Sequence, residues 1–424
     1  MFAFNRFFSI SILLFVLILS LSCSKNNFDS SPYLPLGSDS PENLEINPNI
    51  LQKIDVIVEE AIRNNDAPGA VALIGKDNKI AFFKSYGNRR IRPYLDPMTK
   101  DTIFDLASCS KILGTSTMTM LLLEDGKITL QTKVADILPQ FAQNGKGDVT
   151  IWNLLTHTSG LPPYCDWKEA DNKRGNKTQA DALIDYICSL GKRYPTGEFT
   201  LYSCLNYLTL ARVNETVAGE SMHDFLKKRV WNPLHLESSG YFLTEEQLKR
   251  TAPTSKGDTV TGVGIVHDPL ARYHTATPEH CPGNAGLFMS SHDMAVMAQM
   301  ILNKGRYNNV RIFKPETIDL WTSLQITLST YDSQKKPDFK GEITRRCLGW
   351  ICYMEPPYTV PNAPDASFIG HTGWTGTYIW IDKNSKTFLI FNTNTVHPDG
   401  EPKIHPYRKR ITETLLKSLK LYQM

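Results

Sequence analysis

Residues 70–85 read AVALIGKDNKIAFFKS, and this stretch gives the first indication of the fold. Ala70–Ile74 and Ile80–Ser85 are two short runs rich in apolar residues, each about as long as a strand. The polar residues between them, Lys76 to Lys79, are typical of a tight turn. We therefore expect an antiparallel hairpin in this part of the chain.

A second hairpin is expected near the C-terminus, where Gly376–Asp382 and Lys386–Asn394 flank a turn at Lys383-Asn384. Each hairpin has an amphipathic helix beside it in sequence. Apolar residues recur at helical spacing over Leu51–Ile62, before the first hairpin, and over Tyr407–Leu421, after the second. Strands from the two ends can pair into one sheet. The predicted fold class is α/β (α+β), an antiparallel sheet flanked by helices.

The middle of the chain predicts an inserted, mostly helical lobe, with a cleft between the lobe and the sheet. The domain would then span residues 47–424, with its α/β part formed by 47–107 and 341–424 and the lobe by 108–340. Helical periodicity in the lobe is found in Ser108–Glu124, Asp181–Leu190, Leu205–Ala218, Met222–Val230 and Met294–Leu302.

The N-terminus has the pattern of an export signal. Arg6 precedes an apolar run from Phe7 to Leu21 that ends in small residues before Cys23. This stretch resembles a bacterial lipoprotein signal, which implies removal of residues 1–22 and lipidation of Cys23. The polar, Pro-containing residues 23–46 would be a tether. We expect an exported protein anchored by lipid to a bacterial membrane; an uncleaved anchor helix is the alternative.

Composition excludes several classes of function. The 424 residues carry a formal net charge of only +3, and no dense stripe of Lys and Arg is present, so nucleic acid is not an expected partner. Seven of the eight cysteines follow Cys23, at irregular spacing and without a zinc pattern. No metal or cofactor is expected. A disulfide among these cysteines is compatible with export, but their spacing does not identify the pair.

The candidate nucleophile is Ser108, in the motif Ser108-Cys109-Ser110-Lys111. The same SxxK spacing occurs elsewhere, for example at Ser189 and Lys192, so the spacing alone is weak evidence. Ser108 differs because it follows an extended stretch and opens a helical one. Lys111 would lie one turn further on the same face, where a neutral amine could accept the serine proton. The alternative is a solvated lysine on a surface helix.

Two further motifs follow in the chain. Tyr202-Ser203 comes after a turn and before a buried helix, so the Tyr202 hydroxyl could act as a base, or the ring could be a core aromatic. Gly370–Thr377, which reads GHTGWTGT, opens the penultimate strand. Glycines in a strand mark a close approach of the backbone, and such a strand edge could present a backbone N–H to an oxyanion.

With these motifs the sequence resembles the serine hydrolases related to class C β-lactamases and DD-peptidases, over roughly residues 50–424. The resemblance implies that Ser108 is the nucleophile, Lys111 its partner and Tyr202 the general base. It also implies an oxyanion hole formed by the backbone N–H groups of Ser108 and Trp374, with His371, Thr372 and Gly373 in contact with the substrate. The matching segments are Phe104–Lys111, Thr150–Leu161, Tyr202-Ser203, Val266–Ala271, Asn284–Phe288 with Asp293, Gly370–Thr377 and Asn392–Pro398.

The sequence departs from β-lactamases of this type at two positions. Cys204 stands where they carry a substrate-binding Asn, and thiols are poor hydrogen-bond partners. Asn206 could replace that amide, or could only pack. His371 stands where Lys is common, so the charge facing a substrate carboxylate would depend on pH. These departures favour a D-Ala-D-Ala carboxypeptidase, peptidase or esterase over a β-lactamase.

Several alternatives remain at this point. The substrate could be a small peptide, an ester or a β-lactam, and the protein could also be a penicillin-binding sensor that is acylated without turnover. A thiol hydrolase using Cys109 or Cys204 lacks supporting context. His267, His280 and His292 are expected in loops rather than at a metal, and His157 is expected to order a turn.

Overall fold

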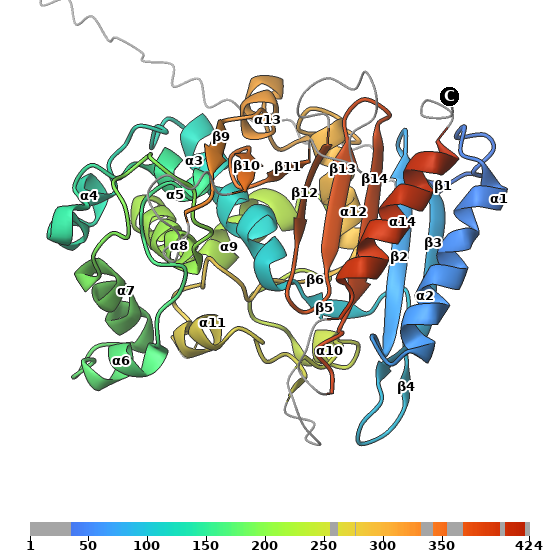
Figure 1. Cartoon of the computed structure of the whole chain (residues 1–424), viewed down its shortest axis with the longest axis horizontal. Helices are drawn as coiled ribbons and strands as arrows, with labels where there is room; N and C mark the ends of the chain where they lie inside the picture. Colours follow the sequence, from blue (N-terminus) through green and yellow to red (C-terminus); the bar gives the residue numbers. More distant parts are fainter. Residues whose placement is uncertain are drawn as a thin grey trace, which may run out of the picture. The chain divides into compact units, whose positions relative to one another are not determined.

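The computed structural model describes residues 35–254, 262–275, 277–331, 342–353, 368–398 and 403–419. Its main element is a sheet in which neighbouring strands run antiparallel except at β1 and β3, which pair in parallel (Figure 1). The order across the sheet is β1 (Gly37–Ser38), β3 (Lys79–Arg90), β2 (Gly69–Lys76), β14 (Thr387–Thr393), β13 (Tyr378–Asp382), β12 (Phe368–Thr372), β11 (Ile351–Tyr353), β10 (Ile343–Arg346) and β9 (Ile326–Ser329), with β4 (Asp96–Pro97) beside β3.

Both expected hairpins are present, and they join the two ends of the chain. In the first, Leu73 of β2 lies opposite Phe83 of β3. In the second, Asp382 of β13 lies opposite Thr387 of β14. Strand β14 then pairs with β2 along its whole length. The predicted antiparallel sheet flanked by helices is therefore confirmed.

The central strands are buried on both faces, so their side chains alternate between two cores. In β14, Phe388 and Ile390 pack in the large core on the lobe side, whereas Leu389 and Phe391 pack toward the terminal helices. A strand covered on both faces is apolar at every position, as β14 is at its centre. The terminal helices on that outer face are α1 (Pro48–Leu51), α2 (Lys53–Arg63) and α14 (His405–Ser418).

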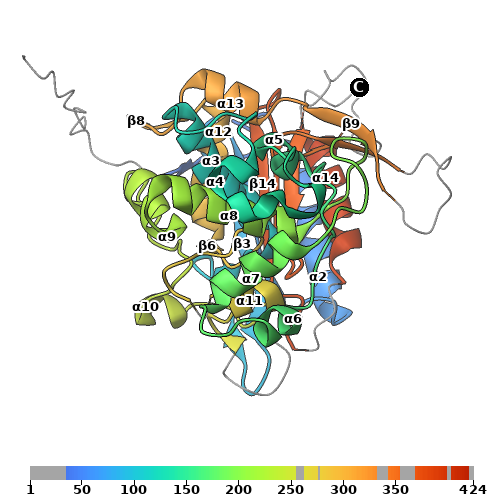
Figure 2. The same cartoon turned by 90° about the vertical axis from the view of Figure 1, so that its left-hand side faces the viewer.

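The lobe lies on the other side and is mostly helical; Figure 2 shows its helices in front of the sheet. Two small two-stranded sheets accompany it, β5 (Ile103–Asp105) with β6 (Phe288–Ser290) and β7 (Arg306–Tyr307) with β8 (Val310–Arg311). The remaining helical elements of the domain are η1 (Ala107–Cys109), η2 (Lys111–Ser116), α3 (Thr117–Glu124), α4 (Val134–Ile137), η3 (Pro139–Gly145), α5 (Ile151–Thr156), α6 (Trp167–Asn172), α7 (Gln179–Ser189), α8 (Cys204–Ala218), α9 (Met222–Leu226), η4 (Lys227–Trp231), α10 (Glu245–Leu248), α11 (Pro269–His274), α12 (Ser291–Leu302) and α13 (Pro315–Trp321).

The expected lobe boundaries, 108–340, are too wide at the C-terminal side. Helix α12 packs against β14 and β2, so it belongs to the sheet half of the domain. Its residues are buried almost all round, as expected of a helix between a sheet and other helices. Strand β9 likewise joins the main sheet at Ile326, before the expected boundary at residue 341.

The expected tether over 23–46 is also too long. Gly37 of β1 pairs with Lys79 of β3, and Leu36, Leu44 and Ile46 are buried. Residues 35–46 therefore belong to the domain, because these apolar side chains leave water on packing. The expected signal, residues 1–22, and Cys23 lie outside the described residues. Within the described ranges, no helix is long and apolar enough to cross a membrane.

We expect Gly75→Ala to destabilise the domain by about 1–3 kcal/mol, because a Cβ atom at this position would lie 2.1 Å from the Phe388 ring carbon. Gly191→Ala is the matched control, since a Cβ there meets no atom within 4 Å. Urea unfolding of both variants measures the difference. Equal urea midpoints for the two variants would show that the structure around Gly75 can relax without loss of stability.

Candidate active site

The segment that carries Ser108 is held in an uncommon backbone conformation. Strand β5 ends at Asp105, and Ala107 has a φ of 44°, which is uncommon for a residue with a side chain. The Ala107 N–H donates to the Asp105 carboxylate at 2.9 Å, and the His267 N–H donates to the other carboxylate oxygen at 2.7 Å. Burial raises the pKa of Asp105 to about 6. The turn that presents Ser108 is thus fixed by a buried carboxylate.

Lys111 lies beside Ser108 and is completely buried. Its Nζ donates to Ser108 Oγ at 3.1 Å, to the Asn284 carbonyl at 2.7 Å and to Cys204 Sγ at 3.7 Å. Three acceptors match the three protons of an ammonium group. Burial opposes the charge, but Cys204 and Tyr202 outweigh it and raise the pKa of Lys111. Lys111 is therefore an ammonium that holds the nucleophile, rather than the neutral amine considered from the sequence.

Tyr202 completes the group. It directly precedes Ser203, whose hydroxyl caps the N-terminus of α8. The His157 ring lies against it with centroids 4.6 Å apart, and His157 Nδ1 accepts from the Ser203 N–H at 3.1 Å. The Lys111 Nζ lies 5.0 Å from the centre of the Tyr202 ring. The structure thus brings Ser108, Lys111 and Tyr202 together, and His157 orders a turn as expected.

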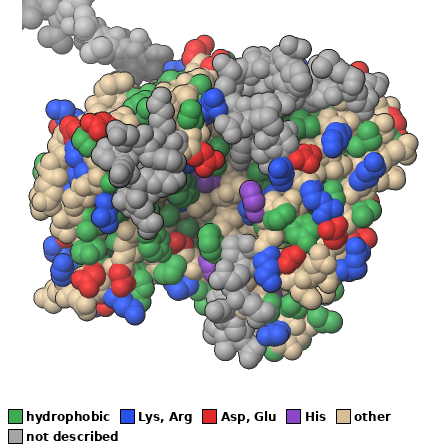
Figure 3. All heavy atoms as spheres, viewed as in Figure 1, with side chains coloured by type: hydrophobic (Ala, Val, Ile, Leu, Met, Phe, Trp, Pro, Cys, Tyr) green, Lys and Arg blue, Asp and Glu red, His purple; other side chains and the backbone are tan. Residues whose placement is uncertain are grey.

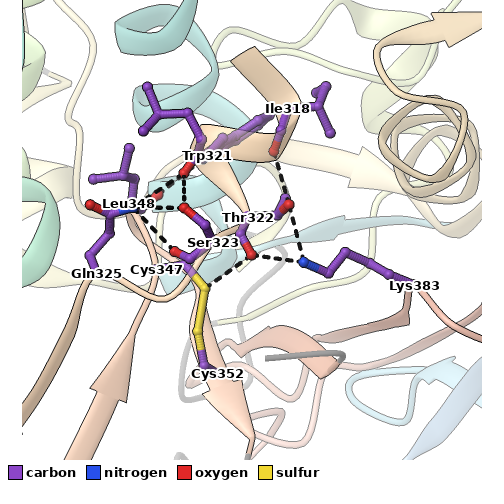
Figure 4. Close-up of a disulfide and its surroundings, with 10 residues drawn as sticks. Ile318, Trp321, Thr322, Ser323, Gln325, Cys347, Leu348, Cys352 and Lys383 are labelled. Carbon is purple, nitrogen blue, oxygen red and sulfur yellow. Dashed lines mark hydrogen bonds between the residues drawn. A yellow bond between two sulfur atoms is a disulfide. The ribbon is translucent and has the colours of Figure 1, made fainter. Parts of the chain in front are cut away.

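Sequence reasoning missed Arg346. Its guanidinium carbon lies 5.4 Å from the centre of the Tyr202 ring, and the side chain is buried. Arg346 ends β10, and a disulfide between Cys347 and Cys352 closes the turn to β11 directly after it (Figure 4). No local pattern distinguishes this arginine from an exposed one, because it meets Tyr202 only through the pairing of β10 with the sheet.

A cavity of 590 Å³ opens in front of these groups. In the space-filling view, histidine side chains lie near the middle of this face, where the surface is hollowed (Figure 3). The cavity is large enough for a small peptide or ester. Its lining residues are Ser108, Tyr202, Ile351, His371, Thr372, Gly373, Trp374, Ile404, His405 and Arg408.

The expected oxyanion donors are both at this cavity. Ser108 lies on the 3₁₀ turn η1, and Trp374 lies in the turn between β12 and β13 with a side chain that is 58% exposed. Within the described ranges, neither backbone N–H has a hydrogen-bond acceptor. Two free N–H groups beside a nucleophile are what an oxyanion hole requires.

His371 differs from the expected pH-dependent cation. Its Nδ1 lies 2.9 Å from the Thr372 carbonyl, which can only accept, so this nitrogen carries the proton. Burial, with Lys111 and Arg346 nearby, lowers the pKa of His371 to about 3. The neutral ring therefore bears a lone pair on Nε2, which has no hydrogen-bond partner among the described residues. The expected imidazolium is wrong for the free protein, because burial beside two cations disfavours the charge.

Asn206 is not at the cavity, so its expected substrate contact is wrong. The side chain is completely buried, with its Oδ1 accepting from Ser159 Oγ at 2.5 Å and its Nδ2 3.2 Å from His157 Nδ1. Both ends of the amide are used within the protein. Cys204, at the position of the family's Asn, contacts Lys111 instead of lining the cavity.

The chain is similar to known proteins over most of its length. A model of the family described as Beta-lactamase matches residues 54–413. A Bacillus subtilis protein named N-acetylmuramyl-L-alanine amidase is 29% identical, covering 86% of each chain. An Escherichia coli K12 protein, provisionally named a D-alanyl-D-alanine carboxypeptidase, is 28% identical over 93% of each chain. A penicillin-binding protein homologue from Caulobacter crescentus has a TM-score of 0.68 at 19% identity, covering 88% of this chain and 99% of its own, which shows the shared fold.

We expect the activity toward a carboxylate substrate and toward a neutral ester to change in parallel between about pH 5 and 8, because His371 stays neutral throughout this range. His371→Lys adds a fixed charge and should favour the carboxylate substrate selectively. The measurement is kcat/KM against pH for both substrates.

A His405→Gln variant is the control, since His405 also lines the cavity. A loss of carboxylate activity near pH 6 that persists in this control and disappears in His371→Lys would contradict the assignment of a neutral His371.

Proposed function

The chain belongs to the beta-lactamase family of serine hydrolases, and on this premise we propose that it cleaves amide or ester bonds through a Ser108 acyl-enzyme. The observation that carries the proposal is the 3.1 Å contact between Lys111 Nζ and Ser108 Oγ at the wall of a 590 Å³ cavity. Ser108, Tyr202 and Trp374 line this cavity, and Lys111 lies buried directly behind Ser108. This arrangement suits acyl transfer.

In the acylation step, which requires Tyr202 as a phenolate beside the Lys111 ammonium, Ser108 Oγ bonds to the substrate carbonyl carbon while its proton passes to the Tyr202 oxygen. The carbonyl electrons move to oxygen, and the N–H groups of Ser108 and Trp374 stabilise the resulting oxyanion. When the tetrahedral intermediate collapses, the bond to the amine or alcohol breaks and that leaving group takes the proton from Tyr202. Lys111 remains an ammonium and stabilises negative charge on the two oxygens.

In the deacylation step, water repeats the same sequence. The water oxygen bonds to the acyl carbon while Tyr202 accepts a proton from the water. The N–H groups of Ser108 and Trp374 again stabilise the oxyanion. Collapse breaks the bond to Ser108 Oγ, which recovers the proton. The products are a carboxylic acid and the free enzyme.

The proposed substrate is a cell-wall peptide ending in D-Ala-D-Ala. The names of the two curated relatives support peptidoglycan as the source, since one denotes an amidase and the other a carboxypeptidase. The cavity beside Ser108, of 590 Å³, is large enough for the end of such a peptide. Cys204, held by Lys111, provides no amide for the side chain of a β-lactam. This favours a carboxypeptidase over a β-lactamase.

We also propose that the protein is exported and anchored through a lipid on Cys23. Arg6, the apolar run after it and the small residues before Cys23 support this location. The disulfide between Cys347 and Cys352 supports it independently, because disulfides persist mainly in oxidising compartments.

Ser108→Ala should abolish covalent labelling by a fluorescent penicillin and lower hydrolysis of a D-Ala-D-Ala peptide by roughly 10³–10⁶-fold. Lys111→Ala and Tyr202→Phe should each cost orders of magnitude, and the double variants should be far from additive because the three groups act together. Label that forms in the wild type and is never released would identify a non-hydrolytic sensor. Activity retained by Ser108→Ala and lost in Cys204→Ala would identify a thiol hydrolase.

The wild-type protein should partition with membranes and take up labelled fatty acid, whereas Cys23→Ala should take up none. Cys109→Ala is a matched control, because Cys109 is buried inside the domain. Fractionation and radiolabelling of cells that produce each variant test this. Continued uptake of label by Cys23→Ala would place the lipid on another residue, and no uptake by the wild type would exclude it.

A further inference from the structure

The Gly373–Trp374 peptide, at the end of β12, has its two polar groups in different surroundings. The C=O and N–H of a trans peptide point in opposite directions. The Gly373 C=O accepts from Arg408 Nη2 at 2.8 Å, and the same nitrogen donates to the Thr377 C=O at 3.1 Å. The Trp374 N–H belongs to the same peptide and has no acceptor within the described ranges. Arg408 therefore holds the side of this peptide opposite to the group expected in the oxyanion hole.

We propose that Arg408 is a positioning residue for the oxyanion hole, which orients and polarises the Gly373–Trp374 peptide so that the Trp374 N–H is a fixed, strong donor. The inference rests on the proposed acyl-enzyme function. A cation on a carbonyl oxygen draws electron density from the peptide, so the N–H becomes more positive. Hydrogen bonds to a charged group are also stronger than neutral ones, which restricts rotation of the peptide.

The same turn is tied to the segment that carries the nucleophile. Thr375 Oγ1 donates to the Asp105 carbonyl at 2.7 Å, and Thr377 Oγ1 donates to the Leu106 carbonyl at 2.8 Å. At Gly373, a Cβ atom would lie 2.1 Å from Thr377 Oγ1 and 2.4 Å from the Leu106 oxygen, so only glycine allows this approach. The turn and the Ser108 segment are thus fixed to each other. Within the turn the Gly373 C=O also accepts from the Gly376 N–H at 3.1 Å, and Arg408 adds a charged donor to the same oxygen.

The position of Arg408 at the cavity wall suggests a rival role. A guanidinium there could bind a substrate carboxylate directly. The two roles predict different kinetics. Binding of a carboxylate raises KM for acidic substrates only, whereas a badly oriented oxyanion donor lowers kcat for every substrate whose carbonyl oxygen becomes negative.

The test uses a neutral ester and its thiono analogue, in which sulfur replaces the carbonyl oxygen and accepts hydrogen bonds weakly. In the full-length protein, Arg408→Met should lower kcat/KM for the oxygen ester by about 10–100-fold, a loss comparable to or smaller than that of a whole oxyanion donor. The thiono ester should change little, so the ratio of the two rates should collapse. Arg408→Lys should recover part of the ratio, because its ammonium can still donate to the Gly373 carbonyl.

Arg410→Met is the matched control. Arg410 lies on the same helix but pairs with Glu60, its two terminal nitrogens at 2.7 and 2.8 Å from the carboxylate oxygens. It should leave both ester rates unchanged. Thermal unfolding of every variant separates loss of fold from loss of rate. If Arg408→Met does not fold, the ratio in Arg408→Gln, which removes the charge but keeps a hydrogen-bond donor, decides the question, and a ratio equal to that of the wild type would overturn the proposal.

Two other results would also overturn it. An equal loss for both esters would show a general structural role, and a higher KM for carboxylate substrates alone would show direct binding. These failures differ from failure of the proposed function. If the proposed function is wrong, the wild type itself would hydrolyse neither ester, and covalent labelling would not depend on Ser108.

Discussion

The buried charge of Lys111 is the constraint on which the site depends. Removing an ammonium from water costs several kcal/mol unless its donors find acceptors. One acceptor, Ser108, lies one turn away on the same segment. The other two, the Asn284 carbonyl and Cys204 at the start of α8, come from distant parts of the chain. The contacts that satisfy the Lys111 ammonium therefore also place Ser108 beside it. A lobe that packed differently would leave the charge without partners.

The sheet holds the turn that carries Trp374 rigidly, whereas the lobe carries the nucleophile. β12 and β13 are central strands with both faces covered, so the turn between them has little freedom. Thr375 and Thr377 in this turn donate to the backbone immediately before Ser108. The cleft is therefore bridged by hydrogen bonds at the level of the oxyanion hole. The two expected donors of the oxyanion hole, Ser108 and Trp374, are far apart in the sequence but lie on segments joined by these hydrogen bonds.

Features that depend on neighbouring residues could be predicted from the sequence, and features that depend on folding could not. The hairpins and the Ser108–Lys111 pair follow from local periodicity and spacing. Arg346 lies beside Tyr202 only because β10 pairs with the sheet. Residues 35–46 belong to the domain because β1 pairs with the edge of β3. His371 was expected to titrate near neutrality; burial, together with the charge of Lys111, which is far away in the sequence, lowers its pKa to about 3. Asn206 lies four residues after Tyr202, which lines the cavity, but its side chain is buried against Ser159 and His157, which spacing alone does not reveal.

Positive charge at the site is carried by lysine and arginine side chains rather than by His371. His371 is neutral, and positive charge resides on Lys111, Arg346 and Arg408. Lys111 and Arg408 are each stabilised by backbone carbonyl oxygens, of Asn284 in one case and of Gly373 and Thr377 in the other. These carbonyl oxygens satisfy N–H donors of the two buried cations inside the protein. The site is thereby preorganised for negative charge on the Ser108 oxygen and on the substrate oxygen, which acyl transfer produces in turn.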